Sequence, residues 1–179
     1  MQANSSGCRP LPGSQGAKRC TDLRDWIFDD FLQTNRVDAV VIGGRWEEED
    51  LSFIPNTIRQ LKTLTNTVIM IGPTVEYQGS LPTLLARSQL KGRSFNFTEH
   101  LTPGRDKINI AIREMAKNEE ITYIDVLSKL CNGEKCILFA PDDVLMQFDY
   151  GHLTFSGAEL VIRQHKKAIS KALESPMAE

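Results

Sequence analysis

The sequence predicts an α/β domain built on a parallel sheet. Three short runs rich in β-branched residues, at 37–44, 67–73 and 121–127, have the composition of buried parallel strands. Segments with apolar residues at helical spacing separate them. Strands that alternate with helices indicate parallel pairing through right-handed crossovers. With 179 residues, 41% of them hydrophobic, the chain is long enough to bury a core.

The first half of the chain predicts helix, strand, helix and strand in turn. Apolar residues from 23 to 31 have helical spacing, and Thr21 can cap the start of that helix. The run at 37–44 ends in two glycines, which end the strand. Apolar residues at 51–64 follow helical spacing again and predict an amphipathic helix before the strand at 67–73.

The second half is less regular at first. The stretch 79–103 predicts a surface excursion, in which Ser80 with Pro82 could open a short helix, and a longer helix follows at 108–115. After the third strand, residues 136–140 are expected to add a small extra strand. Ser156 and Glu159 have the spacing of a capping box and mark the start of the last helix.

Composition narrows the classes of function. A formal net charge of -2 without a basic stripe gives no support for nucleic-acid binding. No apolar run reaches the roughly 18 residues of a membrane span, and Met1 opens no signal-peptide pattern. No phosphate-binding glycine loop is present, so a flavodoxin-like small-molecule binder has little support and no cofactor is expected.

The four cysteines form two local pairs. Cys8 and Cys20 bracket a Pro/Gly-rich loop, and Cys131 and Cys136 bracket a turn-forming stretch. Local pairs that each close a loop are typical of short-range disulfides. Free buried thiols are an alternative. A zinc site has less support, because neither pair has Cys-x-x-Cys spacing and no histidine lies beside either pair.

The most informative segment is 148–158, Phe-Asp-Tyr-Gly-His-Leu-Thr-Phe-Ser-Gly-Ala. Asp149 precedes His152 by three residues, on a turn before the last helix, so their side chains can form a hydrogen bond. The carboxylate would then fix the imidazole tautomer and stabilise its charged form. The far ring nitrogen would be left to act as a base on a hydroxyl nucleophile.

Ligands of open α/β sheets bind beyond the carboxyl ends of the strands, where Gly43, Gly44, Arg45 and Trp46 follow the first run. Their backbone N–H groups, or the Arg45 side chain, could stabilise an oxyanion. Alternatively, the glycines only turn the chain and Trp46 packs on the surface.

Other polar residues have simpler interpretations. Glu76, after the second strand, could contact substrate but is more simply expected to be solvated, and Asp125 is expected to cap a neighbouring turn or helix. His100 and His165 lie in polar surroundings and are expected to be exposed. No spacing joins them to His152 in a metal site, and no metal is expected.

With Leu153-Thr154 and Gly157-Ala158 after it, the Asp149/His152 block resembles the terminal block of SGNH hydrolases. It looks most like the version fused to membrane acyltransferases of the acyltransferase-3 type. Gly43 to Trp46 resembles the Ala-Arg-Trp block of those domains, without the asparagine that other SGNH enzymes place there. The resemblance implies a flavodoxin-like three-layer sandwich with a parallel sheet.

The resemblance also implies acyl transfer. A serine activated by His152 and oriented by Asp149 would take an acetyl group as an ester and pass it to a sugar hydroxyl or to water. It further implies two local disulfides, a periplasmic or otherwise extracytoplasmic location, an acyl donor, a glycan acceptor, and a membrane acyltransferase domain in the full-length parent.

That family carries its serine in a Gly-Asp-Ser block, and no Gly-Asp-Ser occurs in this sequence. We therefore expect the C-terminal portion of an SGNH domain, lacking its first strand or strands. Residues 1–20 would be a disulfide-type loop segment, 21–174 the α/β domain and 175–179 a tail. The alternative is a catalytically inactive α/β binding or remnant module.

Overall fold

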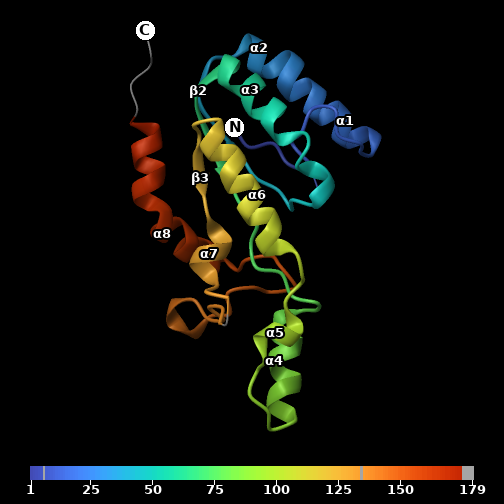
Figure 1. Ribbon diagram of the computed structural model, residues 1–179, viewed down its shortest axis with the longest axis vertical. Coiled ribbons are helices and arrows are strands. Elements are labelled where there is room, and N and C mark those ends of the chain that lie inside the picture. The colour runs from blue at the N-terminus through green and yellow to red at the C-terminus, as the bar shows by residue number, and fades with distance from the viewer. Residues whose placement is uncertain (6, 134, 175–179) are drawn as a thin grey trace.

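Parallel strands form the centre of the fold. The computed structural model describes residues 1–5, 7–133 and 135–174 (Figure 1). Its strands are β1 (Val37–Ile42), β2 (Thr65–Ile71) and β3 (Thr122–Ile124). They pair in parallel in the order β1-β2-β3, with Val40 opposite Val68. The predicted α/β class with a parallel sheet is confirmed.

Helices cover both faces of the sheet. The main ones are α3 (Ile54–Leu64), α6 (Arg105–Asn118) and α8 (Phe155–Leu173). Because successive side chains of a strand point to opposite faces, β2 contributes to two cores. Val68 and Met70 pack in one core with residues of α3 and α6, and Ile69 packs in the other with residues of α8. The result is the predicted three-layer arrangement.

The first helical stretch starts earlier than predicted. It consists of α1 (Lys18–Asp25), η1 (Trp26–Phe31) and α2 (Leu32–Thr34). Thr21 is not its cap, because the hydroxyl donates to the Lys18 carbonyl from within the helix. The middle portion, η1, is a π-helix, which changes the spacing of side chains around the axis. As a result Phe28 is buried, whereas Trp26 is 43% exposed.

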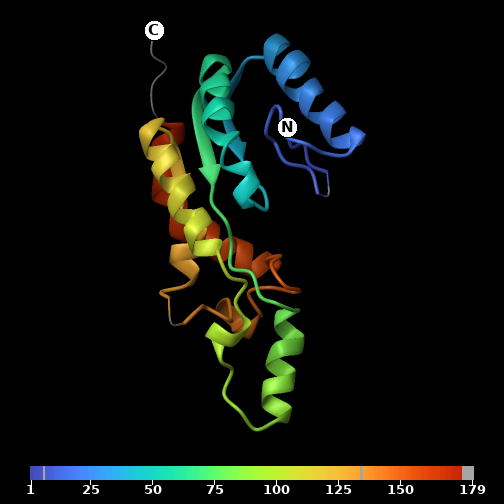
Figure 2. The ribbon, with the colours of Figure 1, turned by 45° about the vertical axis from the view of Figure 1, so that its right-hand side comes forward.

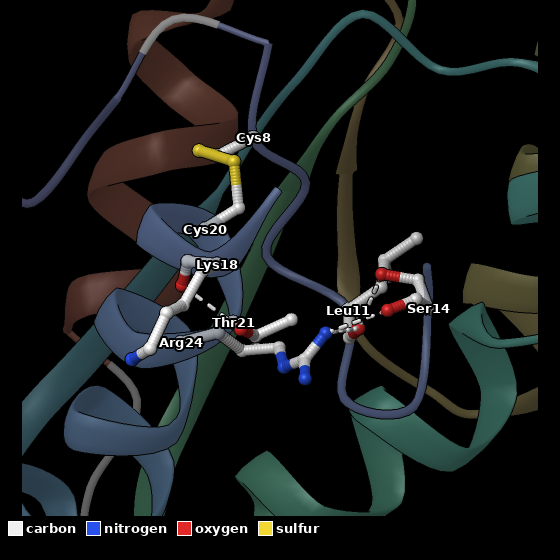
Figure 3. Close-up of a disulfide and its surroundings, with 7 residues drawn as sticks. All are labelled: Cys8, Leu11, Ser14, Lys18, Cys20, Thr21 and Arg24. Carbon is white, nitrogen blue, oxygen red and sulfur yellow. Dashed lines mark hydrogen bonds between the residues drawn. A yellow bond between two sulfur atoms is a disulfide. The ribbon is translucent and has the colours of Figure 1, made fainter. Parts of the chain in front are cut away.

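The segment before this helix packs against the body of the protein. Leu11 is fully buried in the core, and Arg24 donates hydrogen bonds to the carbonyls of Leu11 and Ser14 (Figure 3). A disulfide joins Cys8 to Cys20, and a second joins Cys131 to Cys136. Both are the pairings that the family resemblance implies. The expected tail, 175–179, lies outside the described residues.

Removing the first disulfide is expected to destabilise the protein more than removing the second. A cross-link lowers the conformational entropy of the unfolded chain. The loss grows with the logarithm of the number of residues in the loop that the cross-link closes. The sequence separations are 12 for Cys8–Cys20 and 5 for Cys131–Cys136. The paired Cys→Ser variants should therefore lose about 3 and about 2 kcal/mol of unfolding free energy, respectively. Urea titration measures both losses, and a larger loss for the shorter loop would contradict this order.

Three segments differ from the sequence prediction. The helix that Ser80 and Pro82 were expected to open is present as α4 (Leu81–Leu90), but with ten residues it is longer than predicted, and α5 (Phe97–His100) follows it; Figure 2 shows α4 extending away from the sheet. The third strand stops at Ile124, because α7 (Val126–Leu130) begins directly after Asp125. In place of the predicted extra strand at 136–140 there are only single bridges, from Cys136 to Cys131 and from Phe139 to Leu145.

β1 lies at one edge of the described sheet, although its composition predicts a buried strand. Val41 is 55% exposed, and Asp38 is also exposed. A cavity of roughly 220 Å³ lies beside the strand, lined by side chains of β1 and of the first helical stretch, among them Phe28 and Phe31. An edge strand leaves N–H and C=O groups unpaired along one side. β1 therefore combines the composition of an interior strand with the position of an edge.

His165 is buried, contrary to the prediction from its polar surroundings. It lies four residues after Val161 on the inner face of α8 and is 6% exposed. Burial lowers the pKa of the His165 imidazole below its ordinary value of 6.5, and the positive charge of Lys129 lowers it further against a smaller opposing effect of Asp125. The folded protein therefore favours the neutral imidazole.

Stability is expected to fall as the pH drops below 6.5, the ordinary pKa of histidine. Between that pKa and the lower pKa of the folded state, the unfolded chain binds more protons than the folded chain. One such group contributes at most about 1.4 kcal/mol per pH unit. His165→Gln should reduce the loss of unfolding free energy between pH 7 and pH 5.5. An unchanged pH dependence in urea titrations would contradict this role.

Candidate active site

Asp149 and His152 form the hydrogen-bonded pair that their spacing suggests. Asp149 Oδ2 lies 2.6 Å from His152 Nδ1. Asp149 Oδ1 accepts the backbone N–H groups of Gly151 at 2.9 Å and His152 at 2.8 Å. An aspartate that binds backbone N–H groups two and three residues ahead is a local turn former. The same turn therefore shapes the loop and aims the carboxylate at the imidazole.

The pair is arranged for general-base chemistry. Partial burial alone would raise the pKa of Asp149, but hydrogen bonds from the Gly151 and His152 backbone and from the His152 ring outweigh it and lower that pKa. The carboxylate therefore stays ionised at neutral pH. With Nδ1 engaged, Nε2 is the ring nitrogen that can accept a proton. The side chain of His152 is 64% exposed, so a substrate can reach it.

The start of α8 fixes the other end of this loop. Thr154, not Ser156, is the N-cap, and its hydroxyl accepts the N–H of Gly157 at 3.1 Å. The N–H of Thr154 donates to the Met146 carbonyl. A Cβ atom at Gly157 would lie only 2.4 Å from that same carbonyl oxygen. The chain before the loop and the first turn of α8 therefore pack in direct contact.

The segment that follows β2 forms backbone hydrogen bonds with the loop that carries Asp149 and His152. Tyr77 N–H donates to the Tyr150 carbonyl at 2.8 Å, and Leu81 N–H donates to the Asp149 carbonyl at 3.1 Å. Gln147, which is buried, donates from its side chain to the Val75 carbonyl at 2.7 Å. These bonds place the Asp149–His152 pair at the carboxyl ends of the strands, where ligands bind in open sheets.

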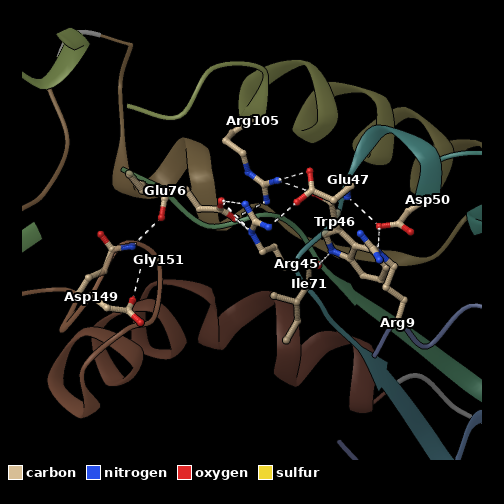
Figure 4. Close-up of polar contacts among 12 residues, drawn as sticks. Arg9, Arg45, Trp46, Glu47, Asp50, Ile71, Glu76, Arg105, Asp149 and Gly151 are labelled. Carbon is tan, nitrogen blue, oxygen red and sulfur yellow. Dashed lines mark hydrogen bonds and ion pairs between the residues drawn. The ribbon is translucent and has the colours of Figure 1, made fainter. Parts of the chain in front are cut away.

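Glu76 is buried in a cluster of charges beside this loop, so the expectation that it is solvated is wrong. Its side chain is 2% exposed and accepts hydrogen bonds from Arg45 at 2.9 to 3.2 Å (Figure 4). Arg105 Nη2 lies 3.1 Å from Glu76 Oε1, an oxygen that Arg45 also contacts. Glu47 contacts both arginines from the opposite side. The hydrogen bonds to Glu76 raise the pKa of Arg45.

The Gly43–Trp46 block is divided between site and core. Gly43, Gly44 and Arg45 are exposed at the end of β1. Arg45 reaches the loop, because its guanidinium lies 5.6 Å from the centre of the Tyr150 ring. Trp46 does not pack on the surface: it is fully buried and donates its indole N–H to the Ile71 carbonyl. A role of Gly43, Gly44 or Arg45 at an oxyanion stays a prediction.

Two aromatic rings flank the imidazole and were not singled out from the sequence. The Phe148 ring lies 5.8 Å from the His152 ring and nearly parallel to it, at 14°. The Tyr150 ring lies 5.6 Å away and edge-on, at 74°. The sequence could have indicated both contacts. Tyr150 and Phe148 precede His152 by two and four positions on a tight turn, and side chains at those distances can reach its ring.

Asp125 has the capping role predicted for it. It is the N-cap of α7 and accepts the N–H of Ser128 at 3.1 Å, while its carboxylate also binds Asn109 and Arg113. Within the described part of the chain, no group of three or more His, Cys, Asp or Glu side chains is arranged to hold a metal ion.

Fold and pair together define an α/β domain of the SGNH type, with an aspartate and a histidine on a loop at the carboxyl end of a parallel sheet. A family model described as the SGNH domain fused to AT3 domains matches residues 1–167. The chain belongs to this family.

A solved structure shares the fold. The periplasmic domain of a lipopolysaccharide acetyltransferase from Salmonella ser. Paratyphi A superimposes with a TM-score of 0.77 at 18% identity, covering 92% of this chain and 69% of that one. An acetylxylan esterase from Geobacillus stearothermophilus is a weaker match, with a TM-score of 0.46, 13% identity and coverage of 89% and 70%. A search of curated protein sequences found no match. None of the helices described here is long and apolar enough to cross a bilayer.

Proposed function

We propose that this SGNH domain transfers or hydrolyses acyl esters, acetyl esters above all, on glycans. The observation that carries the proposal is the contact of 2.6 Å between Asp149 and His152 Nδ1, in a loop fixed at the carboxyl end of the sheet. Asp149 is the orienting residue and His152 the base. The membrane acyltransferase domain of the family supplies the acyl donor, and the acceptor is a cell-envelope glycan.

The proposed reaction has two acyl-transfer steps. A serine hydroxyl attacks the carbonyl carbon of the acyl donor while its proton moves to His152 Nε2. The imidazolium, stabilised by Asp149, returns this proton to the leaving oxygen as the acyl-serine ester forms. A sugar hydroxyl or a water molecule then attacks that ester, again losing its proton to His152, and the serine is regenerated. Backbone N–H groups at Gly43 and Gly44, with Arg45, support the oxyanion.

We place the serine of this proposed reaction in a Gly-Asp-Ser block at the end of a further strand, as in the family. The free edge of β1 supports a place for that strand. A parallel strand laid along β1 would pair with its unpaired groups and cover Val41. Its carboxyl end would arrive beside Gly43 and Arg45, and Arg45 already contacts the loop of the pair through Tyr150.

The two disulfides support an extracytoplasmic location, because such bonds persist in oxidising compartments. The competing proposal is a catalytically inactive binding or remnant module. The absence of Gly-Asp-Ser from the sequence favours it. The two proposals differ in what happens when the missing block is supplied.

The test compares the chain as it stands with a chain preceded by an apolar strand ending in Gly-Asp-Ser. Both are assayed for hydrolysis of an activated acetyl ester and for labelling by a serine-directed phosphonate. We expect no labelling of the chain alone, and both activity and one labelled serine in the extended chain. A folded extended chain with no activity would favour the inactive module. Turnover by the unextended chain would make Ser5 or Ser6 the candidate nucleophile.

A further inference from the structure

Glu76 packs against the turn that carries the Asp149–His152 pair. A Cβ atom at Gly151 would lie 3.2 Å from Glu76 Cγ, so little space separates the two residues. Gly151 donates its N–H to Asp149 Oδ1, the oxygen that also accepts the His152 N–H. A displacement of Glu76 would therefore move Gly151, and with it the N–H group that binds the Asp149 carboxylate.

Two arginines hold the Glu76 carboxylate from different elements. Arg45 comes from the end of β1 and Arg105 from the first residue of α6, and each contacts the carboxylate at about 3 Å. Arg105 and Glu76 are 6% and 2% exposed. A buried ion pair of this kind often adds no stability over apolar side chains of the same size, because removing the charges from water is costly. What the cluster provides is a defined position for Glu76.

The same cluster also reaches the turn through Tyr150. The Arg45 guanidinium lies over the Tyr150 ring, and the Tyr150 ring contacts the His152 imidazole. The backbone of Tyr150 is held by Tyr77, the residue next to Glu76. Glu76 is thus connected to both residues that separate Asp149 from His152, namely Tyr150 and Gly151.

We propose that Glu76 is a positioning residue for the Asp149–His152 pair. Clamped by Arg45 and Arg105, it fixes the backbone of the turn and so the N–H groups that aim the Asp149 carboxylate at the imidazole. The catalytic meaning of the pair rests on the proposed function. The positioning itself is a property of the chain as it stands and can be measured without any activity.

The test is Glu76→Gln, which keeps the size of the side chain and removes its charge. NMR of the whole chain follows the His152 Nδ1 proton, the Gly151 and His152 amides, and the Asp149 carboxyl carbon during a pH titration. We expect the Nδ1 proton signal to be lost to solvent exchange and both amides to shift. The Asp149 titration should move to higher pH, because its N–H donors are displaced. Unchanged Nδ1 and Asp149 signals in the folded variant would overturn the proposal.

Glu47→Gln is the matched control. Glu47 contacts the same two arginines at 3.0 and 3.8 Å and carries the same charge, but it lies on the side away from the turn. We expect it to leave the Nδ1 proton and the Asp149 titration as they are in the unmodified chain. Equal effects of the two variants would show that the charge of the cluster acts at a distance, and the proposed role of Glu76 would be wrong.

A second variant covers the case in which Glu76→Gln does not fold. Arg45→Lys keeps the charge at a site that is half exposed but removes the forked contact with Glu76 and the stacking on Tyr150. We expect shifts at Gly151, Tyr150 and His152, and their absence would again overturn the proposal. An extended chain that shows these shifts but no esterase activity would contradict the proposed function and leave the positioning role intact.

Discussion

His152→Ala is expected to reduce the esterase rate of the Gly-Asp-Ser-extended chain by about 10⁴-fold or more, because replacing even the orienting aspartate of a serine triad costs about 10⁴-fold. The imidazole takes the proton of the attacking hydroxyl and returns it to the leaving oxygen, and no other titratable side chain contacts Asp149 Oδ2 among the described contacts. The loss should fall on kcat, because His152 acts on the reacting atoms and not on the bulk of the substrate.

Asp149→Asn is the informative companion to this variant. An asparagine of the same shape can still accept the Gly151 and His152 N–H groups, but it no longer stabilises the charged imidazolium. We expect a loss similar to that of His152→Ala. His100→Ala, which removes a half-buried imidazole stacked on Phe95, should leave the rate near that of the extended parent. A His152→Ala protein that retains more than a tenth of the parental rate would exclude His152 as the base.

Gly157→Ala is expected to lower the unfolding free energy by about 3 kcal/mol, at the upper end of the usual cost of overpacking. In an ordinary helix this change would stabilise by roughly 0.5–1 kcal/mol. Here the added Cβ would lie 2.4 Å from the Met146 carbonyl oxygen and 3.2 Å from the Thr154 hydroxyl. The Met146 oxygen is a backbone atom and the Thr154 hydroxyl accepts the N–H of Gly157 itself, so the backbone has to move to admit the Cβ.

Gly79→Ala is the control for this substitution. At Gly79 the added Cβ meets only side-chain atoms of Leu84, at 3.7 Å or more, which is ordinary contact. We expect its midpoint in urea to stay close to that of the unmodified chain. A Gly157→Ala protein as stable as Gly79→Ala would mean that α8 and the Met146 carbonyl are not in close contact.

The elements that the sequence predicts well are those whose signal is local. β-branched runs located β1 and β2 to within about two residues of their observed bounds, because composition and period depend only on neighbours in the chain. The Asp149–His152 contact was predictable for the same reason, since only two residues on one turn, Tyr150 and Gly151, separate Asp149 from His152. The π-helical turn in η1 has no such local signal, and within it Trp26, one of the apolar residues at helical spacing, is 43% exposed.

The charge cluster could not be predicted in this way. Arg45 and Glu76 are 31 positions apart, and only the pairing of β1 with β2 brings the ends of those strands together. A lone glutamate in a loop is usually solvated, so its burial depends on partners that the local sequence does not identify. His165 is different, because its spacing of four from Val161 places it on the buried face of α8. The polar residues next to it in the sequence led to the prediction that it is exposed.

The parallel arrangement of the sheet has a consequence for the order of folding. In the described sheet, neighbouring strands are joined by crossovers and not by hairpins, so the pairing of β1 with β2 requires the chain between them, which contains α3, to cross back over the sheet. Contacts between distant residues form slowly, because the entropy of loop closure is lost before the contacts are gained. The Cys8–Cys20 link spans only 12 positions. It closes a loop much shorter than the crossover, so its formation does not depend on whether the sheet has assembled.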